Sequence, residues 1–415
     1  MATEPFVLST AGPDTTQDPY PEYAAARKAG PLAPAVLMGM PGWVAAGHTT
    51  ARELFSDPRL SSDPAAAAPR LRELAPWAFA TQSAGFARSM LRTDPPDHTR
   101  LRRLVSTAFT ARRTEALRPR IQQISDGLLA PLPARGHADL IDDYAAELPL
   151  LVIMELLGVP SEERHYFRSQ SLVAISAPED PAVMFEALGS VRDHLDGLIA
   201  RKRAENTRTG GPDAAPDLLS ELIAARDRDD DRLSDTELRA MAFLLLLAGH
   251  ETTTNLIGNG MLALLRDPEK LERLRADPSL TPVAVEEFLR LDSPVVIAGL
   301  RFATEEIRLG DAVVAPGDAV FIAGGAAGRD PEIHQDPDVL DFGRTRARHL
   351  GFGHGVHFCL GAPLARLEAD IAFRGLLSAL PDIALAVPEN ELRRRRNPNV
   401  RGLRHLPVTF TPRPA

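Results

Sequence analysis

Residues 351–361 read Gly-Phe-Gly-His-Gly-Val-His-Phe-Cys-Leu-Gly and contain the only cysteine of the chain, Cys359. A lone cysteine is by default a small buried hydrophobe. This one follows a glycine-rich loop and precedes a predicted amphipathic helix over 360–380, whose free N–H groups and dipole favour a thiolate. The glycines let the backbone approach a large, flat partner. We therefore expect Cys359 to be an iron ligand or a nucleophile.

A second long helix is predicted upstream, over 234–266, and its centre is polar. Ser234 and Glu237 form a capping box at its start, and its flanks are apolar on all sides, which indicates a helix through the core. Residues 248–254 read Ala-Gly-His-Glu-Thr-Thr-Thr, and the glycine, the three β-branched threonines and the acid are unfavourable in the centre of a buried helix. Threonines bonded back to the preceding turn would give a structural explanation. The acid beside a hydroxyl, Glu251 and Thr252, indicates a proton relay instead.

Two shorter motifs carry paired charges. Glu287 and Arg290 are three residues apart, so on a helix they share a face and can pair. His98 and Arg102 are four residues apart and could clamp an anion. Taken alone, each motif is more typical of solvated surface charge than of a site.

The rest of the pattern is mainly helical with a minor β region. Short strands are expected at about 30–60, including a hairpin at 36–46, and at 293–325. Thr281 is predicted to cap a helix that starts with Pro282. Because no repeat or linker divides the chain, residues 1–415 are expected to form one domain. Further helices are predicted over 21–28, 49–55, 98–108, 113–129, 140–157, 162–171 and 181–206, and a long loop with short helices over 61–90.

The composition of this 415-residue chain excludes several classes of protein. Its net charge of −9 argues against a nucleic-acid binder. The longest apolar run, 241–249, is too short to cross a membrane, and the N-terminus lacks the basic and apolar segments of a signal peptide. A single cysteine excludes a disulfide framework and any multi-cysteine metal site. We expect a cytoplasmic monomer.

Together the motifs resemble the cytochrome P-450 haem-thiolate monooxygenases, in their bacterial, actinomycete-like form. The pattern Phe352-x-x-Gly355-x-x-x-Cys359-x-Gly361 matches the family's haem-binding signature. Residues 248–252 resemble its oxygen-activating helix. The resemblance implies a triangular helical domain with haem b between the long central helix and the helix after the Cys-loop, which spans 350–361.

The two charged motifs fit the same resemblance. Glu287-x-x-Arg290 matches a structural pair of the family, which an arginine from a later segment joins, here Arg344. The segment 94–100, Asp-Pro-Pro-Asp-His-Thr-Arg, is typical of the bacterial members.

The resemblance assigns roles residue by residue. Cys359 would be the proximal iron ligand, with its thiolate favouring O–O cleavage. Glu251 and Thr252 would deliver protons, whereas Glu287 and Arg290 would be structural. The residues expected to contact the haem are His98, Arg102, Ala248, Arg301, Phe352, His357, Cys359 and Gly361.

The implied reaction inserts one atom of O2 into a lipophilic small molecule, by hydroxylation or epoxidation. Electrons from NAD(P)H would arrive through ferredoxin reductase and ferredoxin, because the chain has no room for a fused flavin or iron–sulfur domain. Four arginines near the Cys-loop are expected to form a docking face for an acidic ferredoxin: Arg344, Arg346, Arg348 and Arg366.

The substrate is expected to be a polyketide or macrolide, a terpenoid or a steroid-like molecule, in the tailoring of secondary metabolites such as antibiotics. That expectation rests on analogy, which does not determine a substrate. The residues predicted to line the pocket are Trp77, Phe86, Leu244, Ala248, Val295, Val296 and Ile297.

Three other functions remain open from the sequence. A peroxide-driven or oxidative-coupling haem-thiolate enzyme would have no need of the pair Glu251–Thr252. A haem-binding sensor or carrier would not need that pair either. A cysteine-nucleophile hydrolase would need a base and an orienting group around Cys359, and only His357 lies close by in the sequence.

Overall fold

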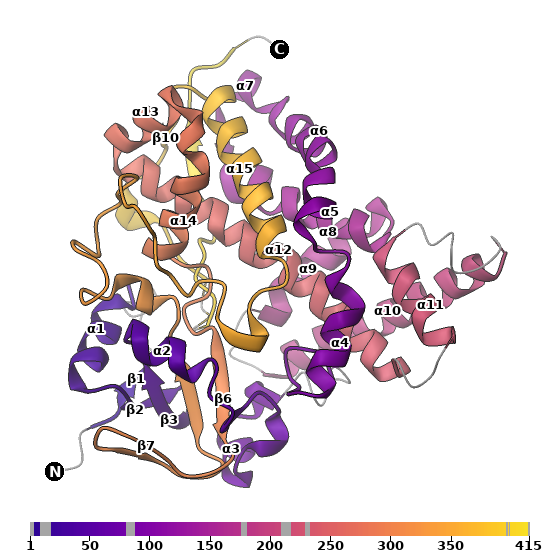
Figure 1. Ribbon diagram of the computed structural model, residues 1–415. Helices are drawn as coiled ribbons and strands as arrows, with labels where there is room; N and C mark the ends of the chain where they lie inside the picture. The colour runs from indigo at the N-terminus through magenta and orange to yellow at the C-terminus, as the bar shows by residue number, and fades with distance from the viewer. Residues whose placement is uncertain are drawn as a thin grey trace.

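The structure is a computed structural model, and it describes residues 4–8, 18–79, 88–175, 181–208, 217–228, 233–395, 397 and 399–413. The molecule is mainly helical with a small β region, as predicted. The β region lies at one end, beside the N-terminal helices α1 (Tyr20–Ala29), α2 (His48–Leu54) and α3 (Pro69–Leu74) (Figure 1). Helices fill the other end.

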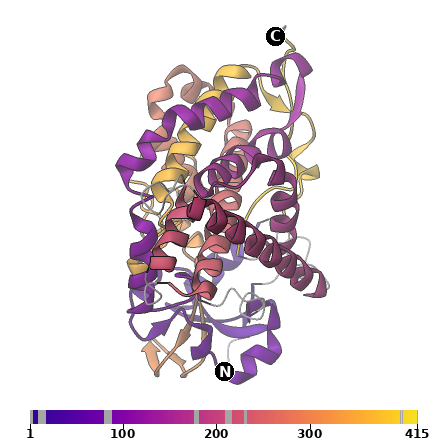
Figure 2. The ribbon, with the colours of Figure 1, turned by 90° about the vertical axis from the view of Figure 1, so that its right-hand side faces the viewer.

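The helices of the larger part follow in chain order. They are α4 (Asp97–Ser106), α5 (Ala111–Ala116), α6 (Arg118–Leu129), α7 (Leu132–Arg135), α8 (Glu147–Leu157), α9 (Arg164–Ile175), α10 (Pro181–Arg208), α11 (Leu218–Arg228), α12 (Asp235–Arg266), α13 (Pro268–Ala276), α14 (Thr281–Leu291) and α15 (Ala362–Ala379). In the view of Figure 2 the long helix α10 crosses the front of this part and extends beyond it.

Helix α12 runs through the centre of the helical part. The predicted capping box is confirmed: the Ser234 hydroxyl accepts from the Glu237 N–H, and the Glu237 carboxylate accepts from the Ser234 N–H. Side chains from α6, α8, α12, α14 and α15 join in one large apolar core. The predicted passage of this helix through the core is therefore confirmed. No helix of the described residues is long and apolar enough to cross a bilayer.

The main sheet joins strands that lie far apart in the sequence. Its order is β1-β2-β3-β9-β6-β4, in which β2 and β3 form the predicted hairpin and β3 runs parallel to β9. Gly42 of β3 is required there, because a Cβ at this position would lie 2.4 Å from the Ala319 carbonyl oxygen. The strands are β1 (Phe6–Val7), β2 (Ala33–Leu37), β3 (Met40–Ala45), β4 (Leu60–Ser61), β6 (Gly299–Ala303) and β9 (Ala319–Ile322).

Two smaller sheets complete the β structure. Strands β7 (Ile307–Leu309) and β8 (Ala312–Val314) form a hairpin. Strand β11 (Pro407–Thr409) lies between β10 (Ala384–Leu385) and β5 (His137–Asp139). The second of these sheets attaches the C-terminal segment to the helical part.

Three local predictions were wrong. The helix expected over 113–129 is two helices, α5 and α6, because Pro119 lacks an N–H and disfavours a continuous helix. The helix expected over 140–157 begins with a π-helical turn, Ile141–Ala145, before α8. Thr281 is the first residue of α14 and not its cap, because its hydroxyl donates to the Pro278 carbonyl oxygen of the preceding 3-10 turn.

Candidate active site

A cavity of about 430 Å³ separates the centre of α12 from the Cys-loop and the start of α15. Cys359 and Leu360 line one side of it, and Ala248 and Thr252 of α12 line the other. Helices α12 and α15 lie next to each other in the molecule (Figure 1). The structure therefore brings together the two motifs that the sequence analysis singled out.

Backbone geometry explains the glycines of the Cys-loop. Gly353 and Gly355 have φ angles of 70° and 71°, in the left-handed region that favours glycine. A Cβ on Gly355 would also lie 2.9 Å from the Phe55 carbonyl oxygen. The loop closes with a 2.8 Å bond from the Cys359 N–H to the Phe352 carbonyl oxygen, which presents the sulfur to the cavity.

The surroundings of the sulfur combine an apolar wall with several donors and charges. Burial raises the pKa of the Cys359 thiol, opposed by the N–H groups of Gly361 and Ala362 and by the charges of Arg102 and Arg366. The Arg366 guanidinium lies 4.5 Å from the Phe352 ring centroid, on the face of that ring. A bound metal cation would overcome the effect of burial, because a coordinating thiol loses its proton.

Arginine and histidine side chains converge at the edge of the cavity, where the Asp94 carboxylate lies near them but forms no ion pair with them among the described residues. Both ring nitrogens of buried His98 lack a hydrogen-bond partner among the described residues. Within the described residues Arg301 makes a single hydrogen bond, to the Leu300 carbonyl oxygen, and burial lowers its pKa to about 10. The His357 ring lies 4.3 Å from that of His98, and its Nε2 atom is 2.9 Å from the Ser62 hydroxyl. These groups are suited to an anionic ligand, since charges buried without partners are costly.

The sequence analysis missed Arg92, which lines the same edge. No ion pair joins Arg92 to any other residue in the described ranges, and burial lowers its pKa. In the sequence, the only sign that Arg92 lies at the cavity was its position just before the 94–100 segment. Arg102 differs from these cations, because it donates to the carbonyl oxygens of Val356 and Phe358 and so holds the Cys-loop in place.

The polar side chains at the centre of α12 point in two directions, some toward the cavity and others into the core. The Thr252 hydroxyl faces the cavity and donates to the Ala248 carbonyl oxygen at 3.0 Å. Glu251 is buried and bonds Arg395 at 2.9 Å, from the C-terminal segment. Burial raises the pKa of Glu251, but His250 and Arg395 outweigh that effect and hold it below its usual range. The partner Arg395 was not predicted, because it lies 144 residues away in the sequence.

Glu368 of α15 is a further group that the sequence did not reveal. It lines the cavity with 1% exposure, and neither carboxyl oxygen has a hydrogen-bond partner in the described part of the chain. Burial raises its pKa to about 8, with nearby Thr253 opposing the shift. Its carboxyl group is therefore mostly protonated at neutral pH.

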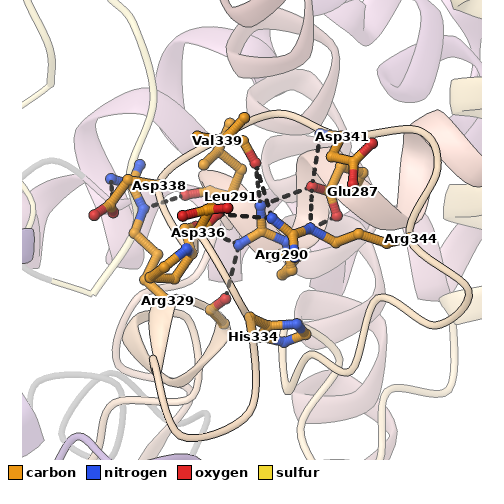
Figure 3. A network of polar contacts seen from close by, with 12 residues as sticks. Glu287, Arg290, Leu291, Arg329, His334, Asp336, Asp338, Val339, Asp341 and Arg344 are labelled. Atoms are coloured by element: carbon orange, nitrogen blue, oxygen red, sulfur yellow. Dashed lines mark hydrogen bonds and ion pairs between the residues drawn. The ribbon is translucent and has the colours of Figure 1, made fainter.

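The Glu287–Arg290 pair belongs to a fully bonded network away from the cavity (Figure 3). The two side chains are 1% and 0% exposed. Arg344 joins them at 3.0 Å from the Glu287 carboxylate, which confirms the prediction that this arginine completes the pair. Gly328 must be glycine here, because a Cβ would lie 2.3 Å from the Arg290 carbonyl oxygen.

The predicted pocket residues divide into three groups. Leu244, Ala248, Val295 and Ile297 line the cavity. Val296 does not line the cavity and packs into the apolar core beside the sheet. Phe86 and the side chain of Trp77 lie outside the described residues. Met90 and Ala298, at the ends of the predicted pocket segments 77–90 and 295–298, also line it, whereas Leu91, Leu300 and Asn399 were not predicted.

Comparison with known proteins identifies the family. The cytochrome P450 family profile matches residues 161–380. The chain is 46% identical over 400 residues to vitamin D(3) 25-hydroxylase of Pseudonocardia autotrophica, with 96% of this chain and 95% of that protein covered. It is 45% identical over 406 residues to the monooxygenase PikC of Streptomyces venezuelae, with coverages of 97% and 94%. The chain belongs to the cytochrome P450 family.

Solved structures support the same assignment. The tirandamycin C-bound P450 monooxygenase TamI superposes with a TM-score of 0.89 at 43% identity, covering 98% of this chain and 100% of that one. The predicted P450 fold is therefore confirmed, and the protein is a cytochrome P450 monooxygenase.

The residues present fit the haem that this family implies. A sulfur faces a large cavity, and the edge of the cavity carries Arg92 and Arg301, which form no ion pair in the described part of the chain, and His98, whose ring nitrogens have no partner there. Such groups are suited to carboxylates. Cys359 would ligate the iron, while Arg92, His98, Arg301 and His357 would hold the propionates.

Proposed function

We propose that this enzyme inserts one atom of O2 into a lipophilic small molecule, with haem bound between Cys359 and Thr252. The observation that carries the proposal is the arrangement of a half-buried cysteine sulfur opposite a hydroxyl, across a cavity with a mainly apolar wall. When bound, haem iron supplies the activation of O2. The protein residues orient the substrate, limit water in the cavity and deliver protons.

The cavity wall is suited to orienting an apolar substrate. Leu244, Val295, Ile297 and Leu300 present hydrocarbon, and Asn399 adds one carboxamide near them. Apolar pockets with few polar groups are typical of small-molecule sites. The wall also excludes bulk water, which strengthens electrostatic interactions inside.

Proton delivery is assigned to Thr252 and Glu251. The Thr252 hydroxyl donates to Ala248, so its oxygen remains free to accept a proton donor from the cavity side. Glu251 precedes Thr252 by one residue and lies on the buried side, where Arg395 helps to keep it ionised. A turn of its side chain toward the cavity would carry protons inward.

The relatives support the proposed class of substrate. Their names include a vitamin D(3) 25-hydroxylase, a 6-deoxyerythronolide B hydroxylase and a polyketide biosynthesis P450. We infer a bulky polyketide, macrolide, terpenoid or steroid-like substrate in secondary metabolism. Monomeric state, single-domain organisation and cytoplasmic location remain predictions from the sequence.

Electrons are proposed to come from a ferredoxin and its reductase, with docking next to the Cys-loop. Val356 and Phe358 expose 52% and 40% of their surface there, beside exposed Arg346 and Arg348. The predicted face needs one correction, since Arg344 is engaged with Glu287 and cannot also serve a partner. Arg366 is held by Glu286 but remains partly exposed.

The experiment measures substrate binding and then coupling, which is the amount of product formed per O2 consumed. Panels of macrolides, polyketides, terpenoids and steroids are titrated into the haem-loaded enzyme, and the shift of the Soret band reports displacement of water from the iron. With a ligand that shifts the band, wild type should convert O2 to product, and Thr252→Ala should consume O2 but release hydrogen peroxide. Equal product per O2 in both proteins would refute the role of Thr252. Product formation from peroxide alone, at the rate with O2, would favour the peroxide-driven alternative.

A further inference from the structure

His250 is the side chain in the centre of α12 to which the proposed relay gives no role. It is 1% exposed, and its Nδ1 atom lies 2.7 Å from the Leu246 carbonyl oxygen. A carbonyl oxygen can only accept, so Nδ1 carries a hydrogen. The tautomer is thereby determined, and Nε2 is the atom whose protonation can change.

The other ring nitrogen faces the acid of the relay. His250 Nε2 has no hydrogen-bond partner among the described residues, and it lies 3.4 Å from the Glu251 Oε1 atom. Without a proton, its lone pair would face a carboxylate oxygen in a buried place, which is unfavourable. With a proton, the same contact becomes a buried ion pair.

The remaining neighbours decide which of the two groups holds the proton. Arg395 bonds the other oxygen, Glu251 Oε2, at 2.9 Å and so favours the carboxylate over the acid. Helix α8 packs against this part of α12 with apolar Ile153, at Gly249. On the α15 side, Glu368 lies next to Thr253 and is mostly neutral. Of the two groups, Glu251 is therefore the one that these neighbours hold ionised.

We propose that His250 is a positioning residue that holds a proton beside Glu251 and reloads that carboxylate during turnover. The proposal rests on the proposed role of Glu251. In the step, the proton leaves Nε2 for Oε1, the imidazole becomes neutral and keeps its Nδ1–H bond to Leu246. Solvent water near Arg395, whose side chain is 13% exposed, returns a proton to Nε2.

The stoichiometry of the reaction explains why a proton held on His250 would be useful. Conversion of substrate, O2, two electrons and two protons yields the hydroxylated product and one water. A single carboxylate delivers one proton and must then be reloaded before the second. A protonated His250 imidazole, with Nε2 3.4 Å from Glu251 Oε1, shortens the time before the carboxylate can deliver the second proton.

The first test observes the proton directly. Histidine-labelled holoenzyme in the diamagnetic ferrous carbon monoxide form is examined by 15N NMR near pH 7, and the His250 signals are assigned by their loss in His250→Gln. We expect both ring nitrogens to be protonated in wild type, and Nε2 to lose its proton in Glu251→Gln. A bare Nε2 in wild type would overturn the proposal.

The second test measures coupling and uses a matched control. His250→Gln and His250→Phe should lower product per O2 several-fold and raise the solvent isotope effect on O2 consumption, with unchanged haem content. His334→Gln removes another buried histidine, bonded to the Arg348 carbonyl oxygen, and should leave coupling unchanged.

The two proposals fail in different ways. If Glu251→Gln and Thr252→Ala couple like wild type, the proposed relay is wrong. If those variants uncouple but both His250 variants couple like wild type, the relay holds and the inference about His250 is wrong.

Discussion

Two groups of buried charge in this molecule differ in one respect, which is whether the protein itself provides their partners. In the Glu287 network every N–H of the Arg290 guanidinium is bonded, to Glu287 and to the carbonyl oxygens of Gly328, Pro337 and Val339 (Figure 3). At the cavity, Arg301 bonds one backbone carbonyl and His98 bonds nothing among the described residues. A charge cluster that is complete by itself stabilises the fold, whereas an incomplete one marks the place of a ligand.

The largest expected effect comes from breaking the complete cluster. Arg290→Leu removes the guanidinium that bonds both Glu287 oxygens and three carbonyl groups, and leaves Glu287 with only Arg344 and the Asp341 N–H. Removal of one partner of a buried pair costs about 3–5 kcal/mol. We expect the free energy of unfolding in urea to fall by that amount, with a loss of soluble protein. Arg308→Leu, on an exposed pair with Glu306, is the control and should change little. Equal stability of Arg290→Leu and wild type would contradict the structural role.

A smaller effect, on haem retention and not on folding stability, is expected at the incomplete cluster beside the cavity. Arg301→Leu removes a buried cation that forms no ion pair in the described structure and has only a longer-range interaction with Asp94, so the haem-free protein should lose little stability. Haem retention should weaken by about 10- to 100-fold, because a charged hydrogen bond contributes about 1.5–3 kcal/mol. Transfer of haem to apomyoglobin measures this, and Arg301→Lys should restore part of the affinity. Unchanged transfer would show that Arg301 does not hold the propionates.

The smallest effect concerns Glu368 and appears only with pH. Its pKa is about 8 in the folded protein against a usual value of 4.5, so folding favours the protonated form. The free energy of unfolding should therefore fall as pH rises from about 4.5 to 8, and stay level above that. Glu368→Gln stays neutral, so it should be more stable than wild type at pH 8–9, by a few kcal/mol at most, and similar at pH 4.

Thermal unfolding of the holoenzyme at several pH values measures this difference. Asp370→Asn on the same helix is the matched control, because Asp370 is paired with Arg118 and Arg374. That substitution should lower stability at pH 8, not raise it. A Glu368→Gln variant less stable than wild type at pH 9 would show that the carboxylate has a partner there.

The sequence predicted features whose cause lies within a few residues. The capping box at Ser234, the glycines around Cys359 and the Glu287–Arg290 pair all depend on neighbours along the chain, and the structure contains each. Arg395 beside Glu251 depends on a contact between distant segments, which no local pattern encodes.

The sequence also did not reveal which charged side chains are buried at the cavity. Glu368 and Arg92 stand in ordinary helical or loop patterns, and only their position at the cavity makes them unusual. The π-helical turn over 141–145 has an apolar pattern compatible with a regular helix, so the sequence could not separate the two. Trp77 and Phe86 remain predictions for the substrate pocket.

The central claim is that Cys359 is the thiolate ligand of a haem iron. The most direct measurement is the difference spectrum of the reduced protein with carbon monoxide. Wild type should show the red-shifted Soret band of thiolate-ligated haem, and Cys359→Ser should lose it while keeping the fold. A purified wild type that binds no haem, or a Cys359→Ser variant with the same red-shifted band, would contradict the account.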